Sequence, residues 1–286
     1  MVSVIIYLLI VLASVTQSAS TKLFNRQSSY SEVFNAIKSL SALILFALMA
    51  IPGFTFHMPT VIFGLAYGAG ICLSMYAGYK ALCLGPMSLT SMLVSFSVVI
   101  PLIWGITFGN ETLNAFKYVA FVLLFIAIIS TNADKFKSGF GKETNYGLWL
   151  LFVVITFLCN GACSILQKQH QTLYPEAYSR EFMFFAMLLC SLIFSVIAIS
   201  RLSFKEIKKT KGKLYGVVSG FSNGMANFLT LIMAGFENAS ILFPIISAGT
   251  VLSALLCGRF VFKEKLKANH YFALAFGILA IVFLKI

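Results

Sequence analysis

Long apolar segments, separated by short polar turns, constrain this chain more than any other feature. A helix needs roughly twenty apolar residues to cross the hydrocarbon core of a bilayer, and ten segments approach that length. Lipid offers no partners to backbone N–H and C=O groups, so we expect every segment to be a helix. The segments are Val2–Ser20, Val33–Ile51, Thr60–Leu84, Met87–Phe108, Phe116–Ser130, Gly147–Gln167, Phe182–Ser200, Leu214–Gly235, Ile241–Phe262 and Ala268–Leu284. The sequence predicts an all-α integral membrane protein with ten transmembrane helices.

The charge content excludes most other classes of protein. Charged residues make up 10% of the chain and hydrophobic residues 59%, whereas a soluble domain has about a quarter charged residues to cover its surface. The net charge of +12 does not indicate nucleic-acid binding, because the basic residues lie in short loops between apolar segments. No cysteine pair, histidine spacing or catalytic motif indicates a metal, a cofactor or an enzyme. We expect neither nucleic acid nor a cofactor as a partner.

Short matches between the two halves of the chain indicate an internal repeat. They occur in the same order in both halves, and the copies are spaced by close to 150 residues. The first repeat is predicted at 1–132, a linker at 133–146 and the second repeat at 147–286. Five helices is an odd number, so the second repeat must enter the membrane inverted, as in many secondary transporters. The matching pairs are Tyr30–Phe34 and Tyr178–Phe182, Gly64–Gly68 and Gly216–Gly220, and Glu111–Leu113 and Glu264–Leu266.

The distribution of Lys and Arg predicts the orientation in the membrane. Sixteen of these residues flank the loops that follow the odd-numbered helices, and four lie on the opposite side. Because cytoplasmic loops are enriched in basic residues, the first side should be cytoplasmic. We expect a multi-pass protein of the bacterial plasma membrane with both termini extracytoplasmic.

With these residues placed, the chain resembles the drug/metabolite transporter superfamily, in its ten-helix, EamA-like branch. The resemblance covers the whole chain and includes small-residue turns into the fourth and ninth helices, Leu84-Gly85-Pro86 and Asn238-Ala239-Ser240. It implies secondary transport of a metabolite. The related short multidrug exporters couple transport to protons through a carboxylate in their first helix. Val2–Ser20 contains no Asp or Glu, which leaves the coupling ion open.

Polar side chains within the apolar segments are the candidates for a substrate cavity. An amide in contact with lipid is costly, so these groups should face the protein interior. They could line a cavity or make hydrogen bonds between helices, and the sequence does not decide between these roles. Asn223 and Asn227 are one helical turn apart and share a face. The candidates are Gln17, Tyr76, Asn160, Asn223, Asn227 and Lys38.

Lys38 is open to two interpretations. A lysine within a helix could bind an anionic substrate, or its long side chain could extend to the headgroups; we favour the second. Two pairs of glycines, Gly64/Gly68 and Gly216/Gly220, have the small-xxx-small spacing that lets helices pack closely.

The sequence thus favours a secondary transporter of a small polar metabolite, such as an amino acid or amine, that works by alternating access. The alternative is a lipid-handling or scaffold membrane protein that moves no solute. The substrate, the direction of transport and the oligomeric state are not predicted.

Overall fold

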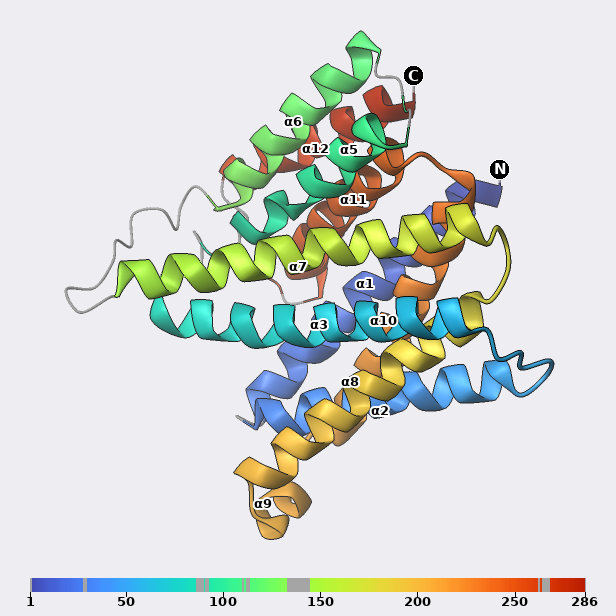
Figure 1. The fold of residues 1–286 in the computed structure, drawn as a ribbon. Coiled ribbons are helices and arrows are strands. Elements are labelled where there is room, and N and C mark those ends of the chain that lie inside the picture. The colour runs from blue at the N-terminus through green and yellow to red at the C-terminus, as the bar shows by residue number, and fades with distance from the viewer. Residues whose placement is uncertain are drawn as a thin grey trace. The chain divides into compact units, whose positions relative to one another are not determined.

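The computed structural model describes residues 2–27, 30–85, 90, 93–109, 111, 114–132, 145–261, 263 and 268–285. Most of the predicted linker 133–146, together with Pro86 and Glu264, lies outside these residues. The described part of the chain is helical and contains no strand. Its helices are α1 (Val2–Gln27), α2 (Ser31–Ala50), α3 (Met58–Leu84), η1 (Phe96–Val98), α5 (Val99–Thr107), α6 (Ala115–Asn132), α7 (Tyr146–Leu173), α8 (Ser179–Arg201), α9 (Phe204–Lys209), α10 (Lys213–Phe236), α11 (Ala239–Phe260) and α12 (Ala268–Lys285) (Figure 1).

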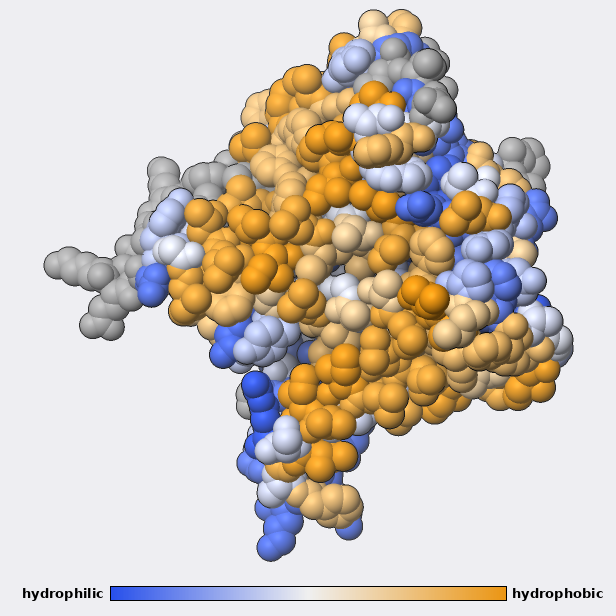
Figure 2. Space-filling view, viewed as in Figure 1, coloured by the Kyte–Doolittle hydropathy of each residue, from blue (hydrophilic) through white to orange (hydrophobic). Residues whose placement is uncertain are grey.

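Seven of the described helices are long and apolar enough to cross a membrane, namely α1, α2, α3, α7, α8, α10 and α11. Three further apolar helices are shorter and cover Leu93–Thr107, Ala115–Ser130 and Ala268–Leu284. Large apolar side chains on the outside of these helices remain exposed, such as Leu48 at 61% and Val196 at 65%. Figure 2 shows hydrophobic residues spread along the helices and hydrophilic ones gathered near helix ends, including the region of α9. The chain is therefore a multi-pass membrane protein.

The chain divides into two compact units, and both combine distant parts of the sequence. Unit 1 comprises Met1–Cys72 and Leu166–Gly235, and unit 2 comprises Leu73–Ile165 and Phe236–Ile286. Helices α3 and α7 contribute to both units.

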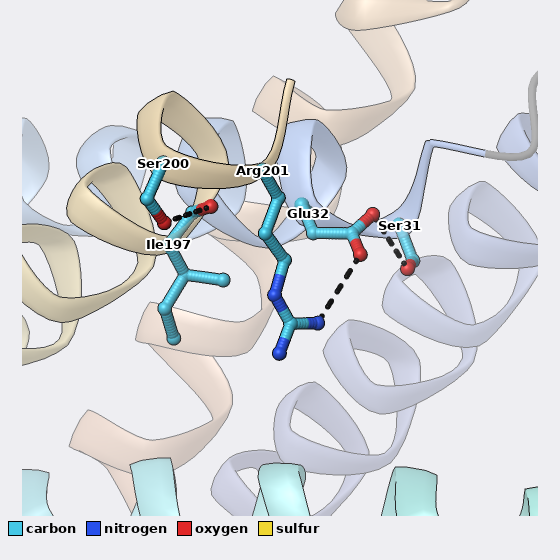
Figure 3. Close-up of polar contacts among 5 residues, drawn as sticks. All are labelled: Ser31, Glu32, Ile197, Ser200 and Arg201. Atoms are coloured by element: carbon cyan, nitrogen blue, oxygen red, sulfur yellow. Dashed lines mark hydrogen bonds and ion pairs between the residues drawn. The ribbon is translucent and has the colours of Figure 1, made fainter.

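In unit 1, α2 and α8 lie side by side and run in opposite directions. Arg180, at the start of α8, donates hydrogen bonds to the carbonyl of Met49, at the end of α2. At the other end of the pair, the Arg201 guanidinium lies 3.7 Å from the Glu32 carboxylate (Figure 3). The ion pair is partly exposed, so we expect it to contribute little to stability. The two contacts define which end of α2 faces which end of α8.

Unit 1 also contains α9, a short helix in the basic stretch between the predicted segments Phe182–Ser200 and Leu214–Gly235. The Ser203 hydroxyl accepts from the Glu206 backbone N–H, and the Glu206 carboxylate accepts from the Ser203 backbone N–H. These reciprocal bonds form a capping box. The hydrogen bonds from Ser203 hold the pKa of the Glu206 carboxyl below its usual range.

In unit 2, α6 and α12 lie side by side. Leu124 and Ile128 of α6 pack with Ala280 of α12 and Ala248 of α11, and all four are almost fully buried. The start of α11 is held by Glu111, which is itself buried. Its carboxylate accepts from the backbone N–H groups of Ala239, at 2.7 Å, and Ser240, at 2.8 Å. A carboxylate at this position also compensates the positive end of the helix dipole.

Candidate functional site

A chain of amide and phenol side chains crosses the interior of unit 1. Asn223 and Asn227 lie near the middle of α10. The Asn223 amide donates to Gln17 Oε1 of α1 at 3.1 Å. The Asn227 amide oxygen accepts from the Tyr67 hydroxyl of α3 at 2.8 Å, and that hydroxyl accepts from Gln167 Nε2 of α7 at 3.1 Å. Four helices thus contribute to one polar cluster, which we call the amide cluster: Gln17, Tyr67, Gln167, Asn223 and Asn227.

The amide cluster has a buried end, at Tyr67 and Gln167, and a partly buried end, at Gln17 and Asn223, where some hydrogen-bonding groups have no protein partner among the described residues. Tyr67 and Gln167 are buried, and Gln167 Nε2 also donates to the Asn227 carbonyl at 3.3 Å. Gln17 and Asn223 are only partly buried. Within the part of the chain that the structure describes, the Gln17 amide nitrogen and the Asn223 amide oxygen have no protein partner. A donor and an acceptor are therefore present together, within membrane-spanning helices, for a further polar molecule.

Of the predicted cavity residues, Gln17, Asn223 and Asn227 come together in the amide cluster. The sequence singled out Tyr76 in the same apolar segment but not Tyr67, because the partners of Tyr67 come from distant helices. A usable signal was its position directly before Gly68, where α3 packs closely on α8.

The other predicted cavity residues lie elsewhere. Asn160 and Tyr76 belong to unit 2. The Asn160 amide oxygen accepts from the Ser74 hydroxyl at 2.6 Å, which joins α7 to α3. Tyr76 is 44% exposed, and the Lys80 ammonium lies 5.9 Å from the centre of its ring.

Lys38 lies within α2 in unit 1 and is partly buried. Its side chain has no hydrogen-bond or ion-pair partner among the described residues. Its backbone carbonyl, in contrast, lies against α10 at Gly220.

The four glycines lie where helices of unit 1 approach each other closely. A Cβ atom added at Gly68 would stand 2.6 Å from the Ala186 carbonyl oxygen of α8, and one at Gly64 would stand 2.7 Å from that of Phe182. On α10, Gly216 faces Ile37 and Gly220 faces the carbonyl of Lys38. Small residues allow close van der Waals packing, which together with interhelical hydrogen bonds drives helix association in lipid, where burial of apolar surface contributes little. These contacts hold α3 and α10 in the positions from which Tyr67, Asn223 and Asn227 meet.

The described residues contain no group of three or more His, Cys, Asp or Glu side chains that could hold a metal ion.

Comparisons with known proteins give the fold and no function. No protein-family model matches the chain, and no curated protein matches it. A solved structure, titled only "Crystal structure of protein", is similar over 98% of this chain and 94% of its own, with a TM-score of 0.77 and 15% sequence identity. The likeness shows that the two chains share a fold.

Proposed function

We propose that this protein is a secondary transporter of a small polar metabolite, such as an amino acid or an amine, and that the amide cluster belongs to its substrate site. The observation that carries the proposal is the unused donor of Gln17 beside the unused acceptor of Asn223, both within membrane-spanning helices. Backbone groups in a helix are already satisfied, so the fold does not need these amides. A solute with neighbouring acceptor and donor groups, as in an amino acid, complements them.

The pairing of helices supports an inverted repeat with 1–132 and 147–286 as its two copies. In that scheme α2 corresponds to α8 and α6 to α12, and each helix lies beside its counterpart. Similarly, Gly64 and Gly68 of α3 pack on α8, and Gly216 and Gly220 of α10 pack on α2. A two-fold axis that relates the two repeats would exchange the contact of α3 on α8 with the contact of α10 on α2. The seven long and three shorter apolar helices would then form two sets of five, the organisation of the EamA-like drug/metabolite transporters.

Such a repeat would support alternating access, because its two halves can exchange conformations across the membrane. The alternative is a lipid-handling or scaffold protein that moves no solute. A scaffold does not need partly buried amides with free hydrogen-bonding groups near mid-helix, so we favour transport.

The proposed orientation places both termini outside the cytoplasm and α9 inside. The side chain of Lys209, at the end of α9, is exposed and is suited to labelling. In bacterial cells that express the protein, a Lys209→Cys variant should resist a membrane-impermeant thiol reagent until the cells are opened. Ready labelling of intact cells would reverse the orientation.

Transport itself is tested by uptake into proteoliposomes. A radiolabelled mixture of neutral amino acids and simple amines should enter saturably in vesicles that contain the protein. Asn227→Ala removes the acceptor for Tyr67, and Asn223→Ala removes a candidate substrate acceptor. Loss of a hydrogen bond worth about 1.4 kcal/mol corresponds to a tenfold weaker apparent affinity.

The matched control is Asn238→Ala. Asn238 precedes α11, is exposed and makes no capping hydrogen bond through its side chain, so its variant should transport like the wild type. Equal uptake by the Asn223, Asn227 and Asn238 variants would exclude the amide cluster as the substrate site. The absence of uptake for every solute would favour the scaffold.

A further inference from the structure

Two histidines that the amide cluster does not use are joined by a hydroxyl group in unit 1. Thr60 Oγ1, near the start of α3, lies 2.9 Å from His57 Nδ1 and 3.0 Å from His170 Nε2 of α7. Thr60 and His170 are completely buried, whereas His57 is only partly buried. The arrangement connects an accessible imidazole to one that is shielded from solvent.

The hydrogen-bond partners of His170 indicate which of its ring nitrogens carries the proton. Gln171 Nε2 lies 3.1 Å from His170 Nδ1 and also donates to the Ser179 hydroxyl. An amide nitrogen can only donate, so His170 Nδ1 accepts and the His170 proton resides on Nε2. His170 then donates to Thr60. The Thr60 hydroxyl is free to donate to His57 Nδ1 when neutral His57 carries its proton on Nε2, and in that tautomer His57 Nδ1 is an acceptor.

Protonation of His57 reverses one bond in the relay. A proton bound at His57 Nδ1 makes that nitrogen a donor, so Thr60 Oγ1 accepts from both imidazoles and its own hydrogen turns away. A threonine hydroxyl in a helix can donate instead to a backbone carbonyl one turn earlier. Because the two imidazoles share one oxygen, a second positive charge on His170 is disfavoured, and the pair binds one proton.

The groups around the relay suit a proton site. The Tyr178 ring is stacked on His57 at 4.4 Å, and the Tyr174 ring packs against both histidines. Three charged groups at this end of unit 1 have partners outside the relay: Glu181 accepts from Thr55, Arg180 donates to the Met49 and Pro52 carbonyls, and Lys168 donates to the Ala234 carbonyl. Glu176, between Tyr174 and Tyr178 in the chain, is exposed. The aromatic faces can accommodate a cationic imidazole.

The relay and the amide cluster share two helices and one aromatic ring. Thr60 and Tyr67 are two turns apart on α3, and Gln167 and His170 are one turn apart on α7, so in each case they lie on the same face. The buried Phe182 ring of α8 packs against His170 at 4.8 Å and against Tyr67 at 5.2 Å. Phe182 is therefore in contact with both the relay and the amide cluster.

We propose that His57, Thr60 and His170 form the proton-binding site that couples solute movement to a proton gradient. The inference rests on the proposed transport function, and it assigns the coupling ion. Solute and proton would influence each other through Phe182 and Tyr67, so that each changes the apparent affinity for the other.

Proton binding can be measured without any solute. The chain has three histidines, so ¹⁵N-histidine labelling of the full-length protein in nanodiscs gives three sets of ring signals, assigned with single His→Gln variants. We expect His170 as the Nε2–H tautomer, and we expect the His57 signals to report uptake of a proton when the sample is acidified. Thr60→Val should change the pH dependence of the His57 signals, Thr60→Ser should restore it, and the His270 signals should not respond to either variant. No proton uptake by His57, or a pH dependence that Thr60→Val leaves unchanged, would overturn the site.

Coupling is measured by uptake of the neutral amino-acid and amine mixture into proteoliposomes with and without an imposed pH gradient. The gradient should stimulate wild-type uptake at least fivefold and should not stimulate uptake by His57→Gln, while His270→Gln behaves as the wild type. Uptake that is insensitive to the gradient in the wild type would overturn the coupling, even if His57 titrates. No uptake under any gradient would overturn the transport function, and the histidine titration would still decide the proton site.

Discussion

The two compact units differ in the polar clusters and helix caps that join their helices. In unit 1 the amide cluster and the histidine relay join side chains that project from within helices. In unit 2 the buried Glu111 carboxylate lies at a helix end, where it accepts from the first N–H groups of α11. Asn160 and Ser74 form a pair between helices.

A cap at a helix end and an amide in mid-helix serve different purposes. The first N–H groups of a helix have no partner within the helix, so a cap such as Glu111 is required wherever a helix begins away from water. Mid-helix backbone groups are already paired, so the amides of α10 add little that the fold requires. We therefore expect substitutions at Glu111 to affect stability and those at Asn223 and Asn227 to affect transport.

The largest effect should come from Gly220→Leu in unit 1. Its side chain would meet the Lys38 carbonyl and lie 2.8 Å from the Cβ of Ser41, and a backbone carbonyl cannot turn aside as a side chain can. Overpacking costs about 1–3 kcal/mol where side chains can adjust, and more where they cannot. We expect most of the folded protein to be lost, as measured by thermal unfolding in detergent and by gel filtration.

The matched control for this prediction is Gly235→Ala on the same helix. A Cβ atom there would meet only the Gln171 side chain, at 3.4 Å, an ordinary contact. If Gly220→Leu unfolds at the same temperature as Gly235→Ala, α2 and α10 do not approach as closely as described.

Glu111→Gln should have the next largest effect, and it should act on stability alone. Glutamine retains one acceptor oxygen, so one of the two N–H groups of Ala239 and Ser240 loses its partner. A buried donor without a partner costs about 1–3 kcal/mol. The unfolding temperature should fall, whereas uptake per folded molecule should stay at the wild-type value.

Glu206→Gln provides the comparison for a cap in solvent, because Glu206 caps the short helix α9 at an exposed position. Its effect on the unfolding temperature should be much smaller. A Glu111→Gln protein of normal stability that has lost uptake would contradict the separation between the two units.

The smallest effect is expected for Lys38→Met. The side chain of Lys38 has no hydrogen-bond or ion-pair partner among the described residues, and a lysine side chain can extend its ammonium to the headgroups. An apolar methionine side chain has a low free-energy cost in a membrane helix, so folding and uptake should stay close to the wild type. A folded but inactive Lys38→Met protein, with activity restored by Lys38→Arg, would instead indicate that the site holds an anionic solute.

The sequence predicted a helical membrane protein from the length of its apolar segments. Lipid offers no hydrogen-bond partners, so the backbone N–H and C=O groups of each segment must pair within a helix. The helix ends were predicted less accurately. Helix α7 continues to Leu173, beyond the predicted end at Gln167, because hydropathy reports the hydrocarbon core and a helix can continue through the headgroups. Helix α9 was missed, although Ser203 followed by Glu206 has the spacing of a capping box.

The sequence by itself also determined that Asn223 and Asn227 share a face, since helical periodicity depends only on spacing. Only the tertiary structure decided which side chains meet that face. Gln17 is 206 positions from Asn223 along the chain, and Thr60 is 110 positions from His170. Periodicity gives the direction of a side chain around its own helix, but not the rotation of that helix against its neighbours. That rotation depends on close contacts such as those of Gly68 and Gly220, which form only when distant helices pack together.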